Sequence, residues 1–297
     1  MVNIRGCITA LVTPFNSLGK VDEKNLKKLI KRQIDNGVHG LVPCGTTGES
    51  PTLSHKEHIK VIEITVKEVK RRIPVIAGTG SNSTQEAIEL TKKAESLGAD
   101  ASLQVVPYYN KPTQRGLYNH FNSIASNTKL PIILYNIPGR SVISLDSKTI
   151  QELEKKNKNI IGIKEASGDL KKIIEIKKKC TEKFLILSGE DNLNLDILKN
   201  GGSGFISVTS NLYPHYCSQM YNFYMSNNIK KSNQINSYLK KINKLLFVET
   251  NPIPIKYALA KYNLIKNELR LPLTQLDPKY YKKINEELKR LKKIQKI

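Results

Sequence analysis

The stretch PVIAGTGSNSTQEAIELTKKAESLGADASLQVV, residues 74–106, contains the pattern that decides the fold. Its two ends, residues 74–77 and 101–106, are short apolar runs of the kind found in buried strands. Between them, residues 84–97 repeat their apolar side chains every three or four positions, which predicts a helix. Parallel strands need a crossover of about a dozen residues or more, so this unit predicts a parallel sheet covered by helices.

The same alternation recurs along the chain. Eight apolar runs can be picked out, at residues 7–12, 40–42, 74–77, 101–106, 131–135, 160–164, 184–187 and 204–208. Eight such units predict an α/β fold, a (β/α)8 TIM barrel. A doubly wound open sheet is the alternative, but no Gly-x-Gly-x-x-Gly motif follows the first run. From about residue 226 only helical patterns follow, so we expect a catalytic barrel over residues 1–225 and a C-terminal all-helical domain over 226–297.

Charge and hydropathy limit the location and the partners of the protein. The formal net charge of +22 raises nucleic acid or an anionic surface as a partner. The lysines, however, recur among Ile and Leu at helical spacing, as in residues 26–32 and 169–179, and such faces are usually only solvated. The apolar stretch at residues 7–12 is too short for a signal peptide or a membrane span. We therefore expect a cytoplasmic protein that binds neither nucleic acid nor a membrane.

Polar residues follow several of the apolar runs, at the end of the barrel where such enzymes have their active sites. Lys164 ends the run of residues 160–164, and strand alternation places it on the same side as Gly162. If that side faces the lumen, desolvation favours the neutral amine, which can attack a carbonyl carbon. The alternative is a lysine paired with a neighbouring carboxylate such as Glu165. Taken alone, Lys164 leaves both interpretations open.

Two further strand ends carry groups suited to the same chemistry. Tyr135 ends the preceding run, where its phenol could relay a proton, although a core tyrosine would give the same pattern. Thr46 and Thr47 lie in a turn flanked by glycines, which can present hydroxyls and backbone N–H groups to a carboxylate. A simple turn is the alternative for the two threonines.

Four separated motifs also carry a family resemblance: Gly45-Thr46-Thr47-Gly48-Glu49-Ser50, Pro107-Tyr108-Tyr109-Asn110, Leu134-Tyr135-Asn136-Ile137-Pro138 and Gly162-Ile163-Lys164-Glu165. In order and spacing they resemble the signatures of the dihydrodipicolinate synthase and N-acetylneuraminate lyase superfamily. The likeness covers nearly the whole chain, from Thr9 to residues 247–252 and beyond. Arg140 makes the chain most similar to the synthase branch, which uses an arginine after this proline to hold the carboxylate of aspartate semialdehyde through two parallel hydrogen bonds. A surface-loop arginine is the alternative.

The resemblance implies a lyase of lysine and diaminopimelate biosynthesis that works through a Schiff base. Pyruvate would condense with Lys164 while Thr46 and Thr47 hold its carboxylate. The enamine would then attack the aldehyde of aspartate semialdehyde, with Tyr135 shuttling protons together with Thr46 and Tyr109. The resemblance implies no metal and no organic cofactor.

The resemblance also implies an assembly and two pocket residues. The family's equivalent of Tyr109 reaches into the site of a neighbouring subunit, which implies a homotetramer built from tight dimers. Gly189 and Ile206, near the ends of the seventh and eighth runs, match positions that line the pyruvate pocket. Plain barrel core is the alternative for both.

A second set of residues matches the positions at which lysine-inhibited members of the family bind their end product: Ser50, His55, His58, Asn82, Glu86 and Tyr108. A carboxylate, an amide and a phenol suit the charged groups of an amino acid. Exposed histidines on the first turn of a helix are the alternative for His55 and His58. We therefore expect L-lysine to be a feedback inhibitor.

The chain departs from the family pattern in two places. Two other functions also compete with the synthase. Ser141-Val142 follows Arg140 where the family usually has Thr-Gly, and Pro51 stands where a small residue is common. Another pyruvate-dependent class I aldolase is the rival enzyme, such as N-acetylneuraminate lyase or a 2-keto-3-deoxy sugar acid aldolase. A non-catalytic basic binding protein on the same barrel is the rival from another class.

Overall fold

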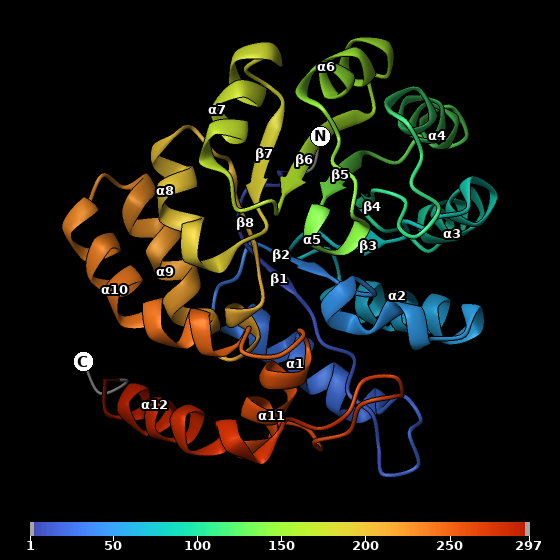
Figure 1. The fold of residues 1–297 in the computed structure, drawn as a ribbon. Helices are drawn as coiled ribbons and strands as arrows, with labels where there is room; N and C mark the ends of the chain where they lie inside the picture. Colours follow the sequence, from blue (N-terminus) through green and yellow to red (C-terminus); the bar gives the residue numbers. More distant parts are fainter. Residues whose placement is uncertain (1–2, 295–297) are drawn as a thin grey trace.

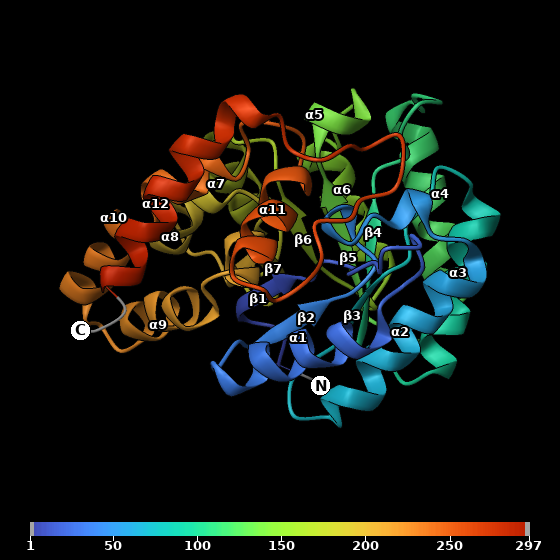
Figure 2. The ribbon, with the colours of Figure 1, turned by 90° about the horizontal axis from the view of Figure 1, so that it is seen from below.

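The chain folds into an eight-stranded parallel barrel surrounded by helices, seen along its axis in Figure 1 and after a 90° turn in Figure 2. The computed structural model describes residues 3–294. The strands are β1 (Gly6–Ala10), β2 (Gly40–Val42), β3 (Ile76–Gly78), β4 (Ala101–Val105), β5 (Ile132–Asn136), β6 (Ile160–Glu165), β7 (Leu185–Ser188) and β8 (Gly204–Ser207). They pair in the order β2-β1-β8-β7-β6-β5-β4-β3, and a parallel bridge from Leu41 to Val75 joins β2 to β3. The sheet therefore closes, and the predicted TIM barrel is confirmed.

The strands coincide with the predicted runs except at some ends. The first run was expected to extend to Val12, but β1 ends at Ala10. Beyond it, the N–H of Leu11 still donates to the carbonyl of Val42, whereas the N–H of Val12 donates to the side chain of Asn211. Strand β3 begins at Ile76, two residues after the start of the predicted run, because Pro74 has no N–H to donate. Pro74 contributes only its carbonyl, which accepts from the N–H of Leu41.

Helices cover the outside of the barrel after each strand. The barrel helices are α1 (Glu23–Asp35), α2 (His55–Val69), α3 (Thr84–Ser96), α4 (Gln114–Ser126), α5 (Pro138–Ser141), α6 (Ser147–Lys156), α7 (Leu170–Lys179), α8 (Asn194–Lys199) and α9 (Pro214–Met225). Most begin at a polar cap: in α2, Ser54 and Glu57 form a capping box that satisfies the first free N–H groups. Short 3-10 turns occupy Thr46–Gly48 (η1), Ser50–Thr52 (η2), Asp191–Leu193 (η3), Thr209–Asn211 (η4) and Pro278–Tyr280 (η5).

The last helices are α10 (Ile229–Leu245), α11 (Ile253–Lys261) and α12 (Tyr281–Ile294). In Figure 1 they lie along one side of the barrel, with α10 beside α9 and with α11 beneath the barrel mouth. Their buried residues Ile242, Leu259 and Ile284 belong to one apolar cluster that also contains Leu26 and Leu41 of the barrel. The segment after α9 thus shares a core with the barrel. The expected division at residue 226 stays a prediction, and residues 295–297 lie outside the described part.

The interior of the barrel is a packed core, as the strand pattern requires. Inward-facing residues from several strands form it, among them Ile8, Ile76, Ile133, Leu187 and Ile206. All of them are less than a tenth exposed. Apolar side chains fill this part of the barrel, whereas polar groups surround the carboxyl ends of several strands, and this placement creates the site described next.

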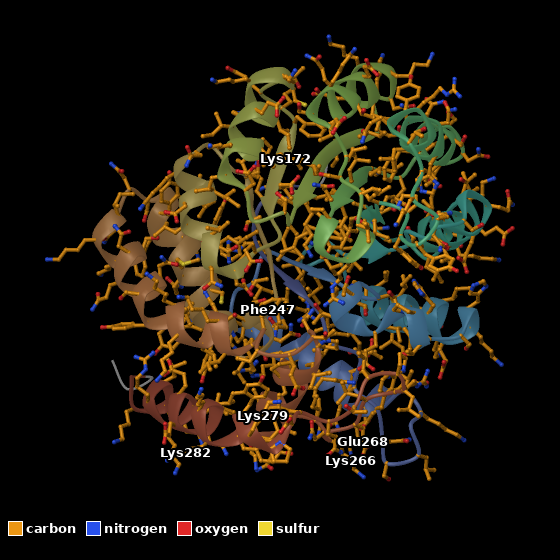
Figure 3. All side chains as sticks on the ribbon, viewed as in Figure 1. Lys172, Phe247, Lys266, Glu268, Lys279 and Lys282 are labelled. Atoms are coloured by element: carbon orange, nitrogen blue, oxygen red, sulfur yellow. The ribbon has the colours of Figure 1, made fainter. Side chains whose placement is uncertain are left out.

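The charged side chains lie mainly on the outside. Figure 3 shows Lys266, Lys279 and Lys282 on the outer side of the C-terminal segment, and all three are exposed. Over residues 3–294, no group of three or more His, Cys, Asp or Glu side chains has the geometry of a metal site. No helix in that range is both long and apolar enough to cross a membrane.

Candidate active site

Lys164 lies near the carboxyl end of β6, between Tyr135 of β5 and Leu187 of β7 in the strand register. Its side chain is only 7% exposed, although it is a lysine. The Nζ atom lies 4.1 Å from the centre of the Tyr135 ring. Lys164 is therefore a buried lysine whose amine lies over an aromatic ring.

The carboxylate that could have paired with Lys164 is engaged elsewhere. Glu165 accepts hydrogen bonds from Asn136 Nδ2 at 3.0 and 2.9 Å, and from the backbone N–H of Ser167 at 2.8 Å. Within residues 3–294, no carboxylate oxygen lies within 4.0 Å of Lys164 Nζ. The geometry therefore does not give Lys164 the structural ion pair that was the alternative interpretation.

Gly189, which follows β7, makes room for the lysine side chain. A Cβ atom at this position would lie 2.9 Å from Lys164 Cε and 2.5 Å from Ala166 Cβ. Any larger residue would push the amine away from its present place. The residue type at position 189 is thus explained by close approach of a neighbouring side chain.

Thr46 and Thr47 lie in the 3-10 turn η1 just after β2, where the sequence predicted a turn. Thr47 is 3% exposed, and its hydroxyl oxygen accepts a hydrogen bond from Asn251 Nδ2 at 3.0 Å. The carbonyl of Asn251 in turn accepts from Arg140 Nη2 at 2.9 Å. One residue of the C-terminal segment therefore connects the threonine turn to the arginine.

Arg140 lies in the short helix α5, directly after β5. Ser141 and Val142, which stand where the family usually has Thr-Gly, follow Arg140. Val142 is the C-cap of α5 and has φ 69° and ψ −33°. A positive φ is strained for a β-branched residue and would be relaxed for glycine. The backbone N–H of Val142 nevertheless donates to the carbonyl of Pro138, which closes the turn that carries Arg140.

These groups surround a small cavity at the carboxyl end of the barrel. Its volume is about 60 Å³, room for on the order of four water-sized groups. Among the predicted residues, the structure brings six to its wall: Thr46, Thr47, Tyr135, Arg140, Lys164 and Gly189.

Other wall residues were not predicted: Ile137, Ala166, Glu190, Val208, Phe247 and Asn251. Glu190 carried the same signal as Lys164, since it follows a strand end. Phe247 and Asn251 follow no strand: they lie between α10 and α11, in the segment 247–252 whose only signal was the family likeness.

Two predicted residues do not line this cavity. Ile206 packs inside the barrel core at 2% exposure, and Val208, two residues further on, occupies the wall instead. Position 206 is still one layer below the mouth of the barrel. Tyr109 is 89% exposed with φ 73°. Its side chain therefore contributes no surface to the cavity of its own chain.

The residues of the expected lysine site gather beside α2 and α3. His55 Nε2 contacts Glu86 Oε1 at 2.5 Å, and Asn82 Nδ2 donates to the carbonyl of Tyr108 at 3.1 Å. A hydrogen bond from Ser81, with a smaller contribution from His55, holds the pKa of Glu86 below its ordinary value.

One member of the set is buried, and burial shifts the pKa of two. His58 is buried with its Nε2 atom 2.7 Å from the carbonyl of Gly78, and burial lowers its pKa. Burial, with a smaller contribution from Glu86, raises the pKa of Tyr108. Ser50 lies in η2, five residues before His55.

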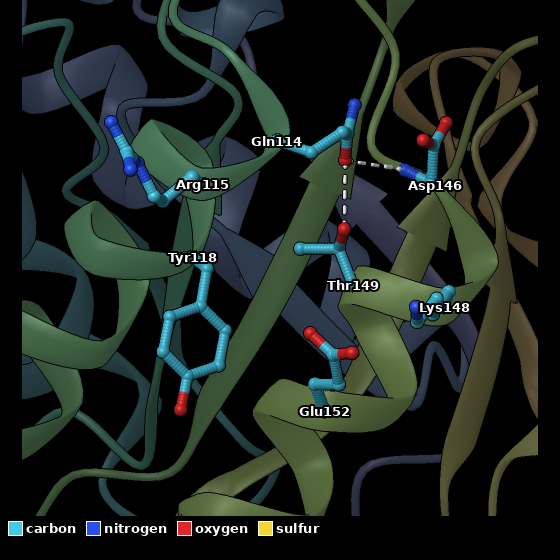
Figure 4. Close-up of a pocket in the computed structure, with 7 residues that line it drawn as sticks. All are labelled: Gln114, Arg115, Tyr118, Asp146, Lys148, Thr149 and Glu152. Atoms are coloured by element: carbon cyan, nitrogen blue, oxygen red, sulfur yellow. Dashed lines mark hydrogen bonds between the residues drawn. The ribbon is translucent and has the colours of Figure 1, made fainter.

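A larger hollow, of about 330 Å³, lies outside the barrel between α4 and α6 (Figure 4). Several of its polar groups bond to one another: the side-chain carbonyl of Gln114 accepts from the hydroxyl of Thr149 at 2.9 Å and from the N–H of Asp146 at 3.0 Å. These bonds join the start of α4 to the start of α6, so we interpret this region as part of the scaffold.

Known proteins resemble the chain over nearly its full length. The model of the dihydrodipicolinate synthetase family matches residues 3–291. A 4-hydroxy-tetrahydrodipicolinate synthase from Thermodesulfovibrio yellowstonii is 51% identical over 285 residues, 96% of this chain and 97% of that protein.

Solved structures agree in fold. A chloride-inhibited dihydrodipicolinate synthase from Acinetobacter baumannii, in complex with pyruvate, superposes with a TM-score of 0.94 at 43% identity over 96% of this chain and 98% of that one. The lysine-bound enzyme from Cyanidioschyzon merolae superposes with a TM-score of 0.94 at 38% identity, over 97% and 98% of the two chains. The chain therefore belongs to the dihydrodipicolinate synthetase family.

Proposed function

We propose that this protein is a 4-hydroxy-tetrahydrodipicolinate synthase, which condenses pyruvate with aspartate semialdehyde through a Schiff base on Lys164. The observation that carries the proposal is a buried lysine that lies at a cavity without a carboxylate partner among the described residues. Such an amine is available as a nucleophile toward a ketone. Family membership supports the choice of reaction.

The first half of the reaction uses the lysine and the threonine turn. Lys164 Nζ attacks the ketone carbon of pyruvate, and loss of water leaves an imine. Thr46 and Thr47 hold the pyruvate carboxylate through hydroxyl and backbone donors, which keeps the ketone at the amine. Tyr135, whose ring packs against the amine, delivers the proton that the departing hydroxyl needs. Loss of a methyl proton then turns the imine into an enamine.

The second half brings in the aldehyde. The enamine carbon attacks the aldehyde carbon of aspartate semialdehyde, whose carboxylate Arg140 holds at the mouth of the cavity. The substrate amine then attacks the imine carbon and displaces Lys164, which closes the ring and frees the enzyme. Tyr135 passes protons along Thr46 and along Tyr109 of a second copy. The exposure of Tyr109 supports this last assignment, and with it a homotetramer built from tight dimers.

Borohydride reduction in the presence of pyruvate tests the carrying step. We expect the protein mass to rise by one reduced pyruvyl group, and peptide mapping to place that group on Lys164. Arg140→Ala should leave this trapping intact while it impairs the use of aspartate semialdehyde at least about tenfold, because a charged hydrogen-bond pair is lost. A variant with unchanged kinetics toward the aldehyde would disprove the role of Arg140.

Feedback inhibition by L-lysine is the regulatory part of the proposal. The gathering of His55, Asn82, Glu86 and Tyr108 supports it, since Glu86 offers a carboxylate to an ammonium group. The lysine complex of the Cyanidioschyzon merolae relative supports it too. Titration with L-lysine should lower the rate of the wild type, whereas Glu86→Gln should resist inhibition. A rate that does not respond to lysine would remove this part and leave the catalytic part standing.

The rivals make different predictions. A sugar-acid aldolase would condense pyruvate with sugar-derived aldehydes faster than with aspartate semialdehyde in a direct assay of both. A basic binding protein would retain DNA in a salt-dependent manner and turn over neither aldehyde. The exposed lysines on the outer helices are the observation that such a protein would use.

A further inference from the structure

A buried polar pair, Asn136 and Glu165, lies directly behind the Schiff-base lysine, on the outer face of the barrel sheet. Asn136 follows Tyr135 at the end of β5, where strand alternation turns it to the opposite face. Glu165 follows Lys164 at the end of β6 in the same way, and the strand register sets the two polar residues opposite each other. Both are buried, at 0% and 2% exposure. The reaction described above uses neither of them.

The two side chains are bonded to each other. The Nδ2 atom of Asn136 donates to both carboxylate oxygens of Glu165, at 3.0 and 2.9 Å, and the N–H of Ser167 donates to the same carboxylate at 2.8 Å. Among residues 3–294, no Lys, Arg or His nitrogen lies within 4.0 Å of that carboxylate. A buried carboxylate without a cation depends on its hydrogen-bond donors, so Asn136 is held firmly in this place.

The backbone of the pair carries part of the cavity wall. The carbonyl of Asn136 accepts from the N–H of Ala166 at 2.9 Å, and the carbonyl of Glu165 accepts from the N–H of Gly189 at 2.7 Å. Ala166 and Gly189 both line the cavity, together with Lys164. A shift of either outward side chain therefore moves the backbone on which this part of the wall is built.

The side chain of Asn136 also closes the loop that carries Arg140. Its Oδ1 atom accepts from the N–H of Leu145 at 2.9 Å, and its Nδ2 atom donates to the hydroxyl of Ser144 at 3.2 Å. Arg140 lies between these two anchors, in α5. One amide thus ties together β5, β6 and the loop that follows α5, three elements that are neighbours in Figure 1.

We propose that Asn136 and Glu165 are positioning residues for the Schiff-base reaction. Their bond on the outer face fixes how Lys164 and Tyr135 face each other on the inner face, where Nζ lies 4.1 Å from the ring centre. Proton transfer during imine formation depends steeply on the placement of these two groups. Neither member of the pair lines the cavity, so both act through their neighbours. This inference rests on the proposed function, because it concerns how the same lysine meets pyruvate.

Removal of the bond tests the idea. Each protein is mixed with pyruvate for a set time and then reduced with borohydride, so that the amount of adduct against time gives the rate constant of imine formation. Asn136→Leu is similar in size but bonds to nothing, and we expect this rate constant to fall at least about tenfold at saturating pyruvate. The half-saturating concentration of pyruvate should change less than about twofold, because the threonine turn that holds the carboxylate is untouched.

An exchange of the two polar groups provides the rescue. Glu165→Gln sets an amide against the amide of Asn136, so one bond is lost and the rate constant should fall about threefold or more. Adding Asn136→Asp to Glu165→Gln again sets one amide against one carboxylate, with the roles exchanged. This double variant should therefore form the imine faster than Glu165→Gln alone. Wild-type rate constants in Asn136→Leu and Glu165→Gln, or a further fall in the double variant, would overturn the inference while the proposed function stands.

Gln104 supplies a matched control on the neighbouring strand β4. It is also an amide on the outer face at 0% exposure, and its Nε2 atom donates to the hydroxyl of Thr91 in α3 at 2.7 Å. Gln104→Leu should lower the midpoint of thermal unfolding, as Asn136→Leu does, yet form the imine within about twofold of the wild-type rate. Equal slowing in both leucine variants would show that the pair only stabilises the sheet, which would overturn the inference. A wild type that forms no pyruvyl adduct would overturn the proposed function as well.

Discussion

Two buried lysines in this protein, Lys164 and Lys256, both lie over an aromatic ring, but only Lys256 has a carboxylate partner among the described residues. Each lies with its Nζ atom 4.1 Å from the centre of an aromatic ring, Tyr135 for Lys164 and Phe15 for Lys256. Lys256 forms an ion pair with Glu49, and both side chains are fully buried. Lys164 has no such partner within the described residues. One amine is paired with a protein carboxylate, and we propose that the other reacts with a substrate.

The difference shows how one barrel supports two kinds of buried cation. Burial lowers the pKa of Lys256, and the carboxylate of Glu49 opposes part of that fall. The pair joins α11 to the segment between η1 and η2, where the backbone N–H of Arg270 also donates to Glu49 at 3.1 Å. Lys256 therefore supports the turn that carries Thr46 and Thr47, while Lys164 faces the cavity that this turn borders.

The largest expected effect comes from removing the unpaired lysine. Lys164→Ala should lower kcat/KM at least about a thousandfold, since the covalent route is lost. No pyruvyl adduct should form under borohydride. The midpoint of thermal unfolding should stay the same or rise, because a poorly solvated amine is replaced by a methyl group. Normal turnover by this variant would break the comparison at its functional end.

Removing the paired lysine should act on stability instead. Lys256→Met leaves the carboxylate of Glu49 buried without its ion-pair partner, which should lower the free energy of unfolding by about 3 kcal/mol. Urea unfolding measures this loss. The double variant Lys256→Met/Glu49→Gln should recover part of it, because no charge is then left unpaired.

A surface lysine supplies the control for this experiment. Lys279 pairs with Asp277 in the open, so Lys279→Met should leave the unfolding midpoint where it is. If Lys256→Met proved as harmless as Lys279→Met, the pair with Glu49 would not be the support that we infer.

His120 shows a third way to bury a base, which is to keep it neutral. It is 6% exposed, its Nδ1 atom lies 2.9 Å from the hydroxyl of Thr84, and burial lowers its pKa to about 4. An unfolded chain takes up the proton near pH 6.5, so stability falls as the pH drops from there toward 4. Between pH 7 and pH 5, the wild type should lose about 2 kcal/mol more than His120→Asn in urea unfolding. Equal losses in the two proteins would show that His120 is not neutral by burial.

The smallest expected effect concerns Asn251, which links the threonine turn to Arg140. Asn251 donates to the hydroxyl of Thr47 and accepts from Arg140 through its carbonyl. Asn251→Ala removes the first bond and keeps the second, so KM for pyruvate should rise about tenfold or less, with a smaller change in kcat. Steady-state kinetics with pyruvate varied at saturating aldehyde measures this. A fall in kcat alone would show that Thr47 does not position pyruvate.

Local sequence patterns predicted part of the site. The rule that strand ends carry the chemistry placed Thr46, Thr47, Tyr135 and Lys164, and all four line the cavity. The same rule would have indicated Glu190 after the seventh run. Ile206 was indicated by the family resemblance instead, and it lies in the barrel core, whereas Val208 lines the cavity.

The sequence by itself determined the barrel, since alternating strand and helix patterns have few ways to bury their apolar faces, and it predicted several of the strand ends that line the cavity. Only the tertiary structure decided which buried lysine has a partner. Glu49 and Lys256 are 207 positions apart, and Thr47 and Asn251 are 204 apart. No local pattern encodes such contacts, because they arise when the C-terminal segment packs against the barrel mouth. This packing gives Lys256 a carboxylate partner and leaves Lys164 without one among the described residues.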